Sequence, residues 1–370
     1  MKLLVLAQIP PPLHGQSVMV RTMLDGLAGR PGLELHHVNL RLSRDAADIG
    51  RARVAKVWAV WRACREARRL AAGHRIDTLY YVPAPGQRAA VCRDWLAMRW
   101  CRPRFARLVL HWHAGGLAAW LDRRATRPER AITRRRLGRA DLAIVLAEAM
   151  RGEAAPFNPA RIVVVPNGIA DPCPDWTPRP RGGAGRAPLR VLHLGLCSPS
   201  KGLFHAVDAV LAANQLARAP GAGPGFVLTV AGPFSDRATE KRLAALAAAH
   251  PDCVHYAGVV AGPRKWQLFA ASDCFCLPTR HPPEGQPLAL LEAMAFDLPV
   301  VATPWRAIPE MLPAQGCHLV APGDSAALAR ALMAVRAAPP EPGRLRRHFL
   351  DHFTAAHHLD ALAAALQLIA

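Results

Sequence analysis

The chain has 370 residues, of which 51% are hydrophobic and 20% are charged. A single hydrophobic core rarely extends beyond about 250–300 residues, so this length predicts two domains, and the apolar content excludes an intrinsically disordered protein. The formal net charge is +20, and no apolar run approaches the roughly 20 residues that a membrane-spanning helix needs.

Short apolar runs alternate with helical stretches along the chain. Strands are expected at residues 3–9, 78–82, 108–111, 142–145, 162–165, 191–194, 227–231, 254–256, 274–277, 300–302 and 318–320. Helices are expected at about residues 17–28, 51–72, 87–101, 203–218, 236–249, 264–271, 287–296 and 324–336. Continuous apolar runs are typical of parallel strands buried on both faces, and their alternation with helices predicts doubly wound α/β sheets.

A stretch rich in proline and glycine divides this pattern into two similar halves. Residues 170–188 contain five prolines and three glycines, which is the composition of a linker. We therefore predict an N-terminal Rossmann-like domain at residues 1–170, a linker at 171–188 and a C-terminal Rossmann-like domain at 189–348. Two such sheets would face each other across a central cleft at the carboxyl ends of their strands, where open α/β folds bind ligands.

The nine cysteines lie singly along the chain, and no two have C-x-x-C spacing. This excludes a disulfide framework and argues against a structural zinc site. The first apolar run is followed by three prolines and lacks the cleavage site of a signal peptide. We therefore expect a cytoplasmic protein whose chain begins with a strand.

Basic residues are concentrated in one part of the chain. Residues 51–140 hold 22 Lys and Arg against 5 Asp and Glu. A localised basic face indicates contact with a polyanion, either a nucleic acid or an anionic membrane surface. No helix-turn-helix, zinc finger or aromatic RNA platform is visible, so no nucleic acid is expected as a partner.

The segment 51–71 combines this charge with aromatic residues. Apolar side chains at helical spacing are Val54, Val57, Trp58, Trp61 and Cys64, and arginines occupy another face. Two interpretations remain open: a core-facing helix with one solvated side, or an amphipathic helix at a membrane interface. We expect the arginines to make the membrane contact and at least one of Trp58 and Trp61 to lie in the core.

The strongest chemical pattern runs from Glu284 to Glu292. A proline at position 287 suits the first turn of a helix, so Glu284 would precede that helix and Glu292 would lie inside it. The backbone N–H groups of the first turn, near residues 286–289, would bind a phosphate together with the positive end of the helix. The other interpretation is a pair of surface glutamates that make only local contacts.

This segment resembles the E-x7-E region of retaining glycosyltransferases of family 4, which have the GT-B fold and are also called glycosyl transferases group 1. Two glutamates lie eight residues apart, the second of them begins the sequence Glu-Ala-Met-Ala, and Pro-Val-Val-Ala-Thr follows. The resemblance implies that Glu284 lies against the transferred sugar and that Glu292 binds the ribose hydroxyls. It also implies donor contacts from Gly285, Gln286, Pro287 and Leu288. Family members usually have glycine where Asp297 stands, outside the expected pocket.

The turn at residues 193–202 resembles the strand–glycine–lysine turn of the same family. There a lysine neutralises the donor diphosphate, which implies this role for Lys201. The arginine that the family usually has five residues earlier is Leu196 here. Arg280 is a possible substitute for it.

Two further loops resemble family elements. The loop after the first strand often carries two glycines near the donor phosphate; Gly15 matches one of them, and His14 is a possible contact. A histidine before glycine touches the donor sugar in the family, which implies a catalytic role for His113. The pair His111 and His113 suggests a metal site at first sight. We expect their rings to point to opposite faces, however, and no carboxylate or cysteine cluster lies nearby in sequence.

Together these patterns predict a metal-independent, retaining glycosyltransferase without a cofactor. It would move a sugar from a UDP- or GDP-sugar to a lipid-linked or glycan acceptor in cell-surface polysaccharide biosynthesis. The domain at residues 1–170 would bind the acceptor, and the domain at residues 189–348 would bind the donor. The basic residues at 51–140 would hold it on the inner face of the cytoplasmic membrane, and the C-terminal helix at 349–370 would pack back on the first domain, as is common in this fold. The alternatives are a nucleotide-sugar epimerase of the same fold and a basic nucleic-acid-binding protein.

Overall fold

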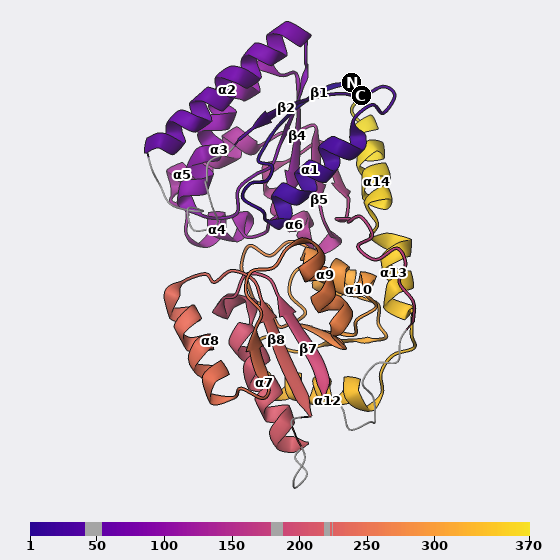
Figure 1. The fold of residues 1–370 in the computed structure, drawn as a ribbon. Helices are drawn as coiled ribbons and strands as arrows, with labels where there is room; N and C mark the ends of the chain where they lie inside the picture. Colours follow the sequence, from indigo (N-terminus) through magenta and orange to yellow (C-terminus); the bar gives the residue numbers. More distant parts are fainter. Residues whose placement is uncertain (41–53, 179–187, 218–222, 224) are drawn as a thin grey trace. The chain divides into compact units, whose positions relative to one another are not determined.

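The structure is a computed structural model that describes residues 1–40, 54–178, 188–217, 223 and 225–370 (Figure 1). Residues 51–53 of the predicted basic helix, the side chain of Val54, residues 179–187 of the predicted linker and residue 218 at the predicted end of a helix lie outside this description. The chain forms two compact units. Unit 1 comprises residues 1–168, 283–286 and 355–370, and unit 2 comprises residues 169–282 and 287–354.

Unit 1 is built on a six-stranded sheet of order β2-β1-β3-β4-β5-β6 in which every pair is parallel. The strands are β1 (Lys2–Ala7), β2 (Glu34–Asn39), β3 (Thr78–Tyr81), β4 (Arg107–Trp112), β5 (Leu142–Val145) and β6 (Ile162–Val164). The helices are α1 (Gly15–Leu27), α2 (Val54–His74), α3 (Arg88–Cys101), α4 (Leu117–Arg123), α5 (Arg127–Leu137), α6 (Arg151–Ala154) and α14 (Ala355–Gln367).

Unit 2 has a second six-stranded parallel sheet, of order β12-β11-β10-β7-β8-β9. Its strands are β7 (Leu189–Leu194), β8 (Phe226–Ala231), β9 (Val254–Tyr256), β10 (Cys274–Leu277), β11 (Val300–Ala302) and β12 (Cys317–Leu319). Its helices are α7 (Leu203–Leu216), α8 (Arg237–Ala249), α9 (Gly262–Ala271), α10 (Leu288–Ala295), α11 (Ile308–Met311), α12 (Ser325–Ala337) and α13 (Arg344–His352). The prediction of two doubly wound parallel sheets is confirmed.

The end of the chain is divided between the two units. Helix α14 contributes Leu362, Ala365 and Leu366 to the apolar core that contains Leu3 and Val5 of β1, within unit 1. Helix α13 instead packs in unit 2, where Phe349 is fully buried. The predicted C-terminal helix at 349–370 is therefore two helices, and only residues from 355 onward belong to unit 1.

Asp297, at a position where the resembling family usually has glycine, has a clear structural role in unit 2. Its φ of 58° lies in the left-handed region that favours glycine. Asp and Asn tolerate this region better than other side chains do. The carboxylate of Asp297 accepts hydrogen bonds from the backbone N–H groups of Gly343, Leu345 and Arg346 at 2.8, 3.0 and 3.2 Å. Asp297 therefore provides acceptors for the backbone N–H groups at the N-terminus of α13. A glycine has no side chain that could accept these hydrogen bonds.

Candidate active site

The sheet of unit 2 has its topological switch point between β7 and β10. The chain leaves β7 toward β8 and β9 on one side, and it leaves β10 toward β11 and β12 on the other. In open α/β sheets, ligands bind outside the carboxyl ends of the strands at such a point. Lys201 follows β7, and the loop that begins at Pro278 follows β10. The two predicted donor-binding segments therefore start from the two strands that flank the switch point.

Lys201 ends a single turn of 3₁₀ helix, Pro199–Lys201, whose N-cap is Ser198. The Ser198 hydroxyl accepts a hydrogen bond from the backbone N–H of Lys201 at 3.2 Å. The next residue, Gly202, has a φ of 82°, and a Cβ atom there would lie 2.1 Å from the carbonyl oxygen of Pro278. Glycine at this position therefore lets the turn at residues 199–202, called the lysine turn below, contact the backbone of the loop after β10.

Two hydrogen bonds join the lysine turn to this loop. The backbone N–H of Arg280 donates to the Ser200 carbonyl at 2.8 Å, and the Ser200 hydroxyl lies 2.8 Å from Nδ1 of His281. The side chain of Arg280 is exposed. The sequence had not singled out Ser200 or His281, because serine and histidine in a proline-rich loop carry no distinctive pattern.

Glu292 lies in the middle of α10 and is buried in unit 2. One of its carboxylate oxygens contacts the ammonium group of Lys265 on α9. The other oxygen, Oε2, has no hydrogen-bond partner among the described residues. Burial raises the pKa of Glu292, and the Lys265 ammonium acts against this rise. A buried carboxylate oxygen that lacks a donor is suited to accept a hydrogen bond from a ligand hydroxyl.

Helix α10 begins at Leu288, and Pro287 is its N-cap rather than its first helical residue. The backbone N–H groups of the first turn of a helix have no partner within the helix. The helix therefore offers anion-binding groups at Leu288 and Ala289, directly after the segment 283–286.

The segment 283–286, predicted within the donor-binding domain, belongs instead to unit 1. Glu284 in this segment is buried. A Cβ atom on Gly285 would lie 2.2 Å from the carbonyl oxygen of His113, so this glycine permits close backbone packing. The side-chain oxygen of Gln286 accepts a hydrogen bond from the backbone N–H of Asn167 at 2.5 Å. The Asn167 amide donates to the Gln286 carbonyl at 3.3 Å. The Gln286 side chain thus anchors the segment in unit 1.

His113 lies just after β4, and its ring stacks on that of His111 with the centroids 4.0 Å apart and the planes at 33°. The expectation that these rings point to opposite faces is wrong. Residues two apart along a strand share a face, and the residue between them, Trp112, points the other way and packs near Phe157. The phenol of Tyr80 lies 2.5 Å from Nδ1 of His111, and this contact holds the His111 ring in place.

Both ring nitrogens of His113 are buried and lack hydrogen-bond partners among the described residues. Burial, together with smaller effects of the nearby His358 and His14, lowers the pKa of His113 to about 3. The imidazole is therefore neutral at physiological pH. A neutral ring with two unsatisfied nitrogens can donate one hydrogen bond to a ligand and accept another.

His14 and Gly15 open α1 in unit 1. The Nδ1 atom of His14 accepts a hydrogen bond from the backbone N–H of Ser17 at 3.3 Å, and the Ser17 hydroxyl accepts one from the His14 N–H at 3.1 Å. His14 is therefore the N-cap of the helix. Gly15 is its exposed first residue, at the carboxyl end of β1.

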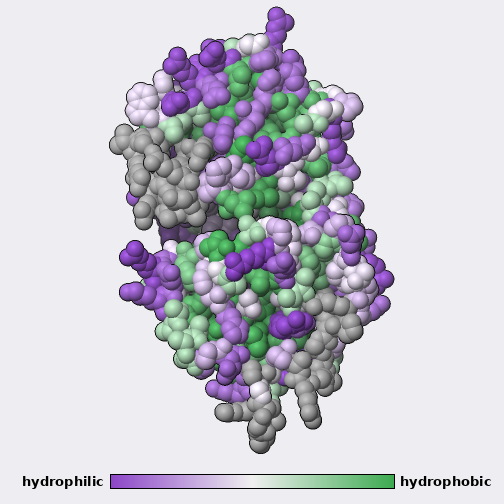
Figure 2. All heavy atoms as spheres, in the orientation of Figure 1, coloured by the Kyte–Doolittle hydropathy of each residue, from purple (hydrophilic) through white to green (hydrophobic). Residues whose placement is uncertain are grey.

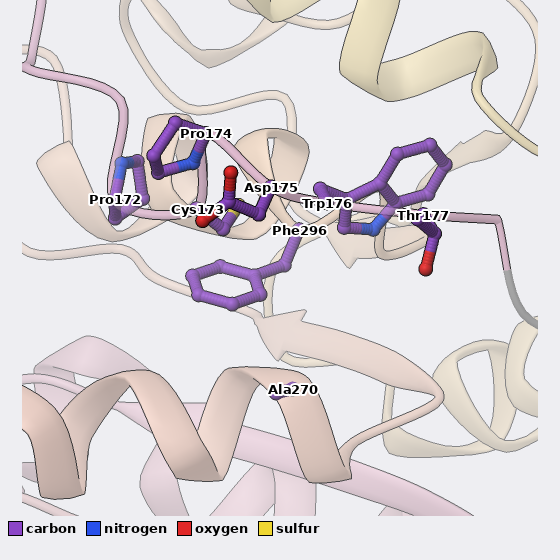
Figure 3. Close-up of a pocket in the computed structure, with 8 residues that line it drawn as sticks. All are labelled: Pro172, Cys173, Pro174, Asp175, Trp176, Thr177, Ala270 and Phe296. Carbon is purple, nitrogen blue, oxygen red and sulfur yellow. The ribbon is translucent and has the colours of Figure 1, made fainter.

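The candidate residues do not form a metal-binding group. Among the described residues, three side chains that could together hold a metal ion occur in one group, Glu34, His36 and His74, toward the amino ends of the unit 1 strands. A pocket of about 400 Å³ in unit 2 is also separate from the candidate residues. It is lined by the segment from Pro172 to Thr177 together with Ala270 and Phe296 (Figure 3).

The two tryptophans of α2 are both exposed, whereas the sequence predicted that at least one of them lies in the core. Trp58 is 60% exposed and Trp61 is 37% exposed, so neither lies in the core. The buried face of the helix consists of smaller residues: Val60, Ala63, Cys64, Ala67 and Ala71. The two indole rings meet edge to face at 5.1 Å, with the Arg65 guanidinium 5.6 Å from the centre of the Trp61 ring. Hydrophilic residues dominate much of the surface in this part of unit 1 (Figure 2).

Comparisons with known proteins agree with the motifs described above. Residues 188–337 match the family described as Glycosyl transferases group 1. The chain is 31% identical over 151 residues to the amylovoran biosynthesis glycosyltransferase AmsK of Erwinia amylovora, a match that covers 40% of this chain and 35% of the relative. It is 28% identical over 203 residues to the putative colanic acid biosynthesis glycosyltransferase WcaL of Escherichia coli K12, covering 53% of this chain and 48% of the relative. The chain thus matches less than half the length of either curated relative.

Solved structures show the same fold over the whole chain. HepE of Anabaena, solved in complex with UDP, superposes with a TM-score of 0.70 at 17% identity and full coverage of both chains. Sucrose-phosphate synthase of Thermosynechococcus elongatus gives a TM-score of 0.73 at 16% identity, covering 100% of this chain and 99% of that one. The predicted GT-B fold is therefore confirmed. In the part of the chain that the structure describes, no helix has both the length and the apolar character needed to cross a membrane.

Proposed function

Since residues 188–337 match the family described as Glycosyl transferases group 1 and the chain has the GT-B fold, we propose that it is a glycosyltransferase. It transfers a sugar from a nucleotide-sugar donor, a UDP- or GDP-sugar, to a lipid-linked or glycan acceptor. The two curated relatives are named for the biosynthesis of amylovoran and colanic acid, which supports a role in the synthesis of a cell-surface polysaccharide.

The observation that carries this proposal is the set of groups around the switch point of unit 2. Lys201 follows β7, and α10 begins a short distance after β10. A lysine and the N-terminus of a helix are the groups that bind a diphosphate. The buried Oε2 atom of Glu292, which lacks a donor among the described residues, suits a ribose hydroxyl. A nucleotide needs groups that bind its diphosphate and groups that bind its ribose. Unit 2 offers both kinds, so we propose that unit 2 binds the donor.

Glu284 and the neutral His113 are the proposed groups at the transferred sugar. His113 offers ring nitrogens for sugar hydroxyls, and the carboxylate of Glu284 stabilises positive charge as the sugar becomes oxocarbenium-like. We propose retention of the anomeric configuration, with the leaving phosphate assisting deprotonation of the acceptor. The chain contains no D-x-D sequence, and we propose that Lys201 and backbone N–H groups neutralise the diphosphate without a metal.

Membrane association is proposed for α2 in unit 1. Trp58 and Trp61 are exposed on the same helix as the exposed Arg62, Arg65 and Arg69. Indole rings beside arginines suit the boundary between lipid headgroups and acyl chains. An anionic inner membrane surface would bring the enzyme to a lipid-linked acceptor.

The donor is tested with a panel of UDP- and GDP-sugars scored by protection against thermal unfolding, because a ligand that binds the native state raises its stability. We expect one nucleotide class to protect. Lys201→Ala should weaken that binding by about 10- to 150-fold, since a charge-assisted contact contributes about 1.5–3 kcal/mol. The matched control is Lys241→Ala on α8, which is exposed and far from the switch-point loops in sequence. Unchanged affinity in Lys201→Ala would contradict the assignment.

Chelation with EDTA should leave the transfer rate unchanged.

A further inference from the structure

Unit 1 carries a cluster of three potential metal ligands that the proposed transfer reaction does not use. Glu34 and His36 are two residues apart on β2, so their side chains share a face of the strand. His74 is the last residue of α2. Nε2 of His36 lies 2.7 Å from Oε1 of Glu34, and the rings of His36 and His74 have centroids 4.4 Å apart.

The donor atoms of these side chains are close enough to share one ion. One ligand atom from each residue lies within 4.8 Å of the other two. Ligands of a tetrahedral zinc ion at bond lengths of about 2.0–2.2 Å are separated by about 3.4 Å. Small side-chain rotations would close the remaining difference. Two imidazoles and one carboxylate are a donor set that zinc uses where a fourth position is left to water.

A hydrogen-bonded surface cluster is the competing explanation, and Lys2 is central to it. The Lys2 ammonium lies 3.1 Å from Oε2 of Glu34 and donates to the His74 carbonyl at 3.1 Å. Lys2 and Glu34 are both well exposed, however, and an exposed ion pair contributes little to stability. The ammonium can therefore turn into water when a cation arrives. Oε1 of Glu34 already faces His36 rather than Lys2.

We propose that Glu34, His36 and His74 form a binding site for a divalent transition-metal ion of the zinc class. The ion would join the start of β2 to the end of α2. Lys2 pairs with Glu34 in the sheet register, so the site lies toward the amino ends of the strands. His14 and His113 follow the carboxyl ends of β1 and β4. The proposed ion is therefore separate from the residues proposed for sugar transfer.

The test uses the full chain, freed of metal by chelation and dialysis, and titrates it with Zn²⁺ alone under calorimetry. We expect one site per chain. His36→Ala and His74→Ala should each weaken binding by about tenfold or more, because each removes a ligand. His255→Ala removes an exposed histidine on β9 of unit 2 and should leave binding unchanged. Lys2→Ala should bind the ion at least as tightly as the wild type, since the competing ammonium is gone.

The nine cysteines could bind zinc instead, so Co²⁺ serves as a spectroscopic probe of the ligands. A site made of Glu34, His36 and His74 gives visible cobalt bands without a sulfur-to-cobalt charge-transfer band in the near ultraviolet. A charge-transfer band, no saturable binding by the wild type, or wild-type affinity in both His36→Ala and His74→Ala would each overturn the proposal. Chelated protein should keep its nucleotide affinity, so failure here is distinguishable from failure of the proposed function.

Discussion

The ammonium group of Lys265 contacts one carboxylate oxygen of Glu292, and the second oxygen of that carboxylate is buried with no hydrogen-bond partner among the described residues. The two residues lie on neighbouring helices in sequence, α9 and α10 of unit 2. Lys265 also lies 4.7 Å from the centre of the Trp266 ring. We infer that Lys265 is a positioning residue, which keeps Glu292 ionised and leaves its second oxygen for the ribose.

Lys265→Met should weaken binding of the protective nucleoside diphosphate by about tenfold or more. Burial raises the pKa of Glu292, and removal of the Lys265 cation would raise it further. The variant should therefore lose affinity at a higher pH than the wild type as the solution is acidified. Titrations from pH 8 to pH 5 measure this difference. Lys241→Met, on the exposed face of α8, is the control. Identical pH profiles for Lys265→Met and the wild type would show that the pair has no role in binding.

Gly285→Ala should reduce both thermal stability and sugar transfer. The new Cβ would lie 2.2 Å from the His113 carbonyl oxygen, so the segment 283–286 must move away from the backbone of His113. Overpacking of this kind costs about 1–3 kcal/mol. Gly152→Ala is a matched control in the same unit, because its Cβ would meet no atom within 4 Å. Differential scanning fluorimetry and a transfer assay check both variants. Wild-type behaviour of Gly285→Ala would contradict the packing described for this segment.

The sequence could predict most of this architecture because buried parallel strands are continuous apolar runs. β10, at Cys274–Leu277, and β5, at Leu142–Val145, have the predicted bounds. β2 was missed because it is an edge strand with the sequence ELHHVN, in which one residue is fully buried. α5 was missed because two of its eleven residues are buried, although Thr126 and Glu129 form a capping box that signals its start.

The sequence motifs located the candidate side chains but could not show their partners. Spacing alone placed Glu284 and Glu292 around the start of one helix, yet the structure assigns them to different units. The contacts of Glu292 with Lys265, and of Gln286 with Asn167, join residues 27 and 119 positions apart. Such contacts depend on the packing of whole elements. The burial of α2 was also mispredicted, because helical spacing identifies an apolar stripe without showing which part of it is covered.

The stability of the protein should fall as the pH drops below about 6.5, in part because of His113. Burial holds the pKa of folded His113 at about 3, whereas an unfolded histidine titrates near 6.5. Protonation therefore favours the unfolded chain. The stability that neutral His113 contributes is fully present above about pH 6.5 and is lost as the pH falls toward 3. The loss amounts to about 2 kcal/mol of the free energy of unfolding at pH 5.

Urea denaturation at pH 7 and pH 5 measures this loss. His113→Gln cannot be protonated in this range, so it should lose less stability between the two pH values than the wild type does. His255→Gln, at an exposed position of unit 2, is the control and should keep the wild-type difference. Equal losses in His113→Gln and the wild type would mean that His113 is not held neutral by burial.

Replacement of Trp58 and Trp61 by alanine should weaken binding to vesicles that contain anionic lipid. Both rings are exposed, so the double variant should change the unfolding temperature by no more than about 2 °C. Arg65→Ala should weaken vesicle binding by about fivefold, since a basic residue near an anionic surface contributes about 1 kcal/mol. Added salt should weaken binding of the wild type.

Vesicle co-sedimentation measures these effects, and Leu216→Ala supplies an exposed apolar control on α7 of unit 2. A wild-type protein that stays in the supernatant with anionic vesicles at low salt would contradict the membrane proposal. A large fall in the unfolding temperature of the double tryptophan variant would contradict the exposed placement of the two rings.

The central claim is that the chain transfers a sugar from a nucleotide-sugar donor and that the carboxylate of Glu284 acts at that sugar. The most direct measurement is release of nucleoside diphosphate from a panel of UDP- and GDP-sugars with a lipid-linked acceptor. Wild-type protein should turn over one donor class. Glu284→Gln should lower kcat by about 100- to 1000-fold with little change in nucleotide affinity, because the carboxylate acts where positive charge develops. Glu240→Gln on α8 should keep wild-type kinetics. Full turnover by Glu284→Gln, or no turnover of any donor by the wild type, would contradict the claim.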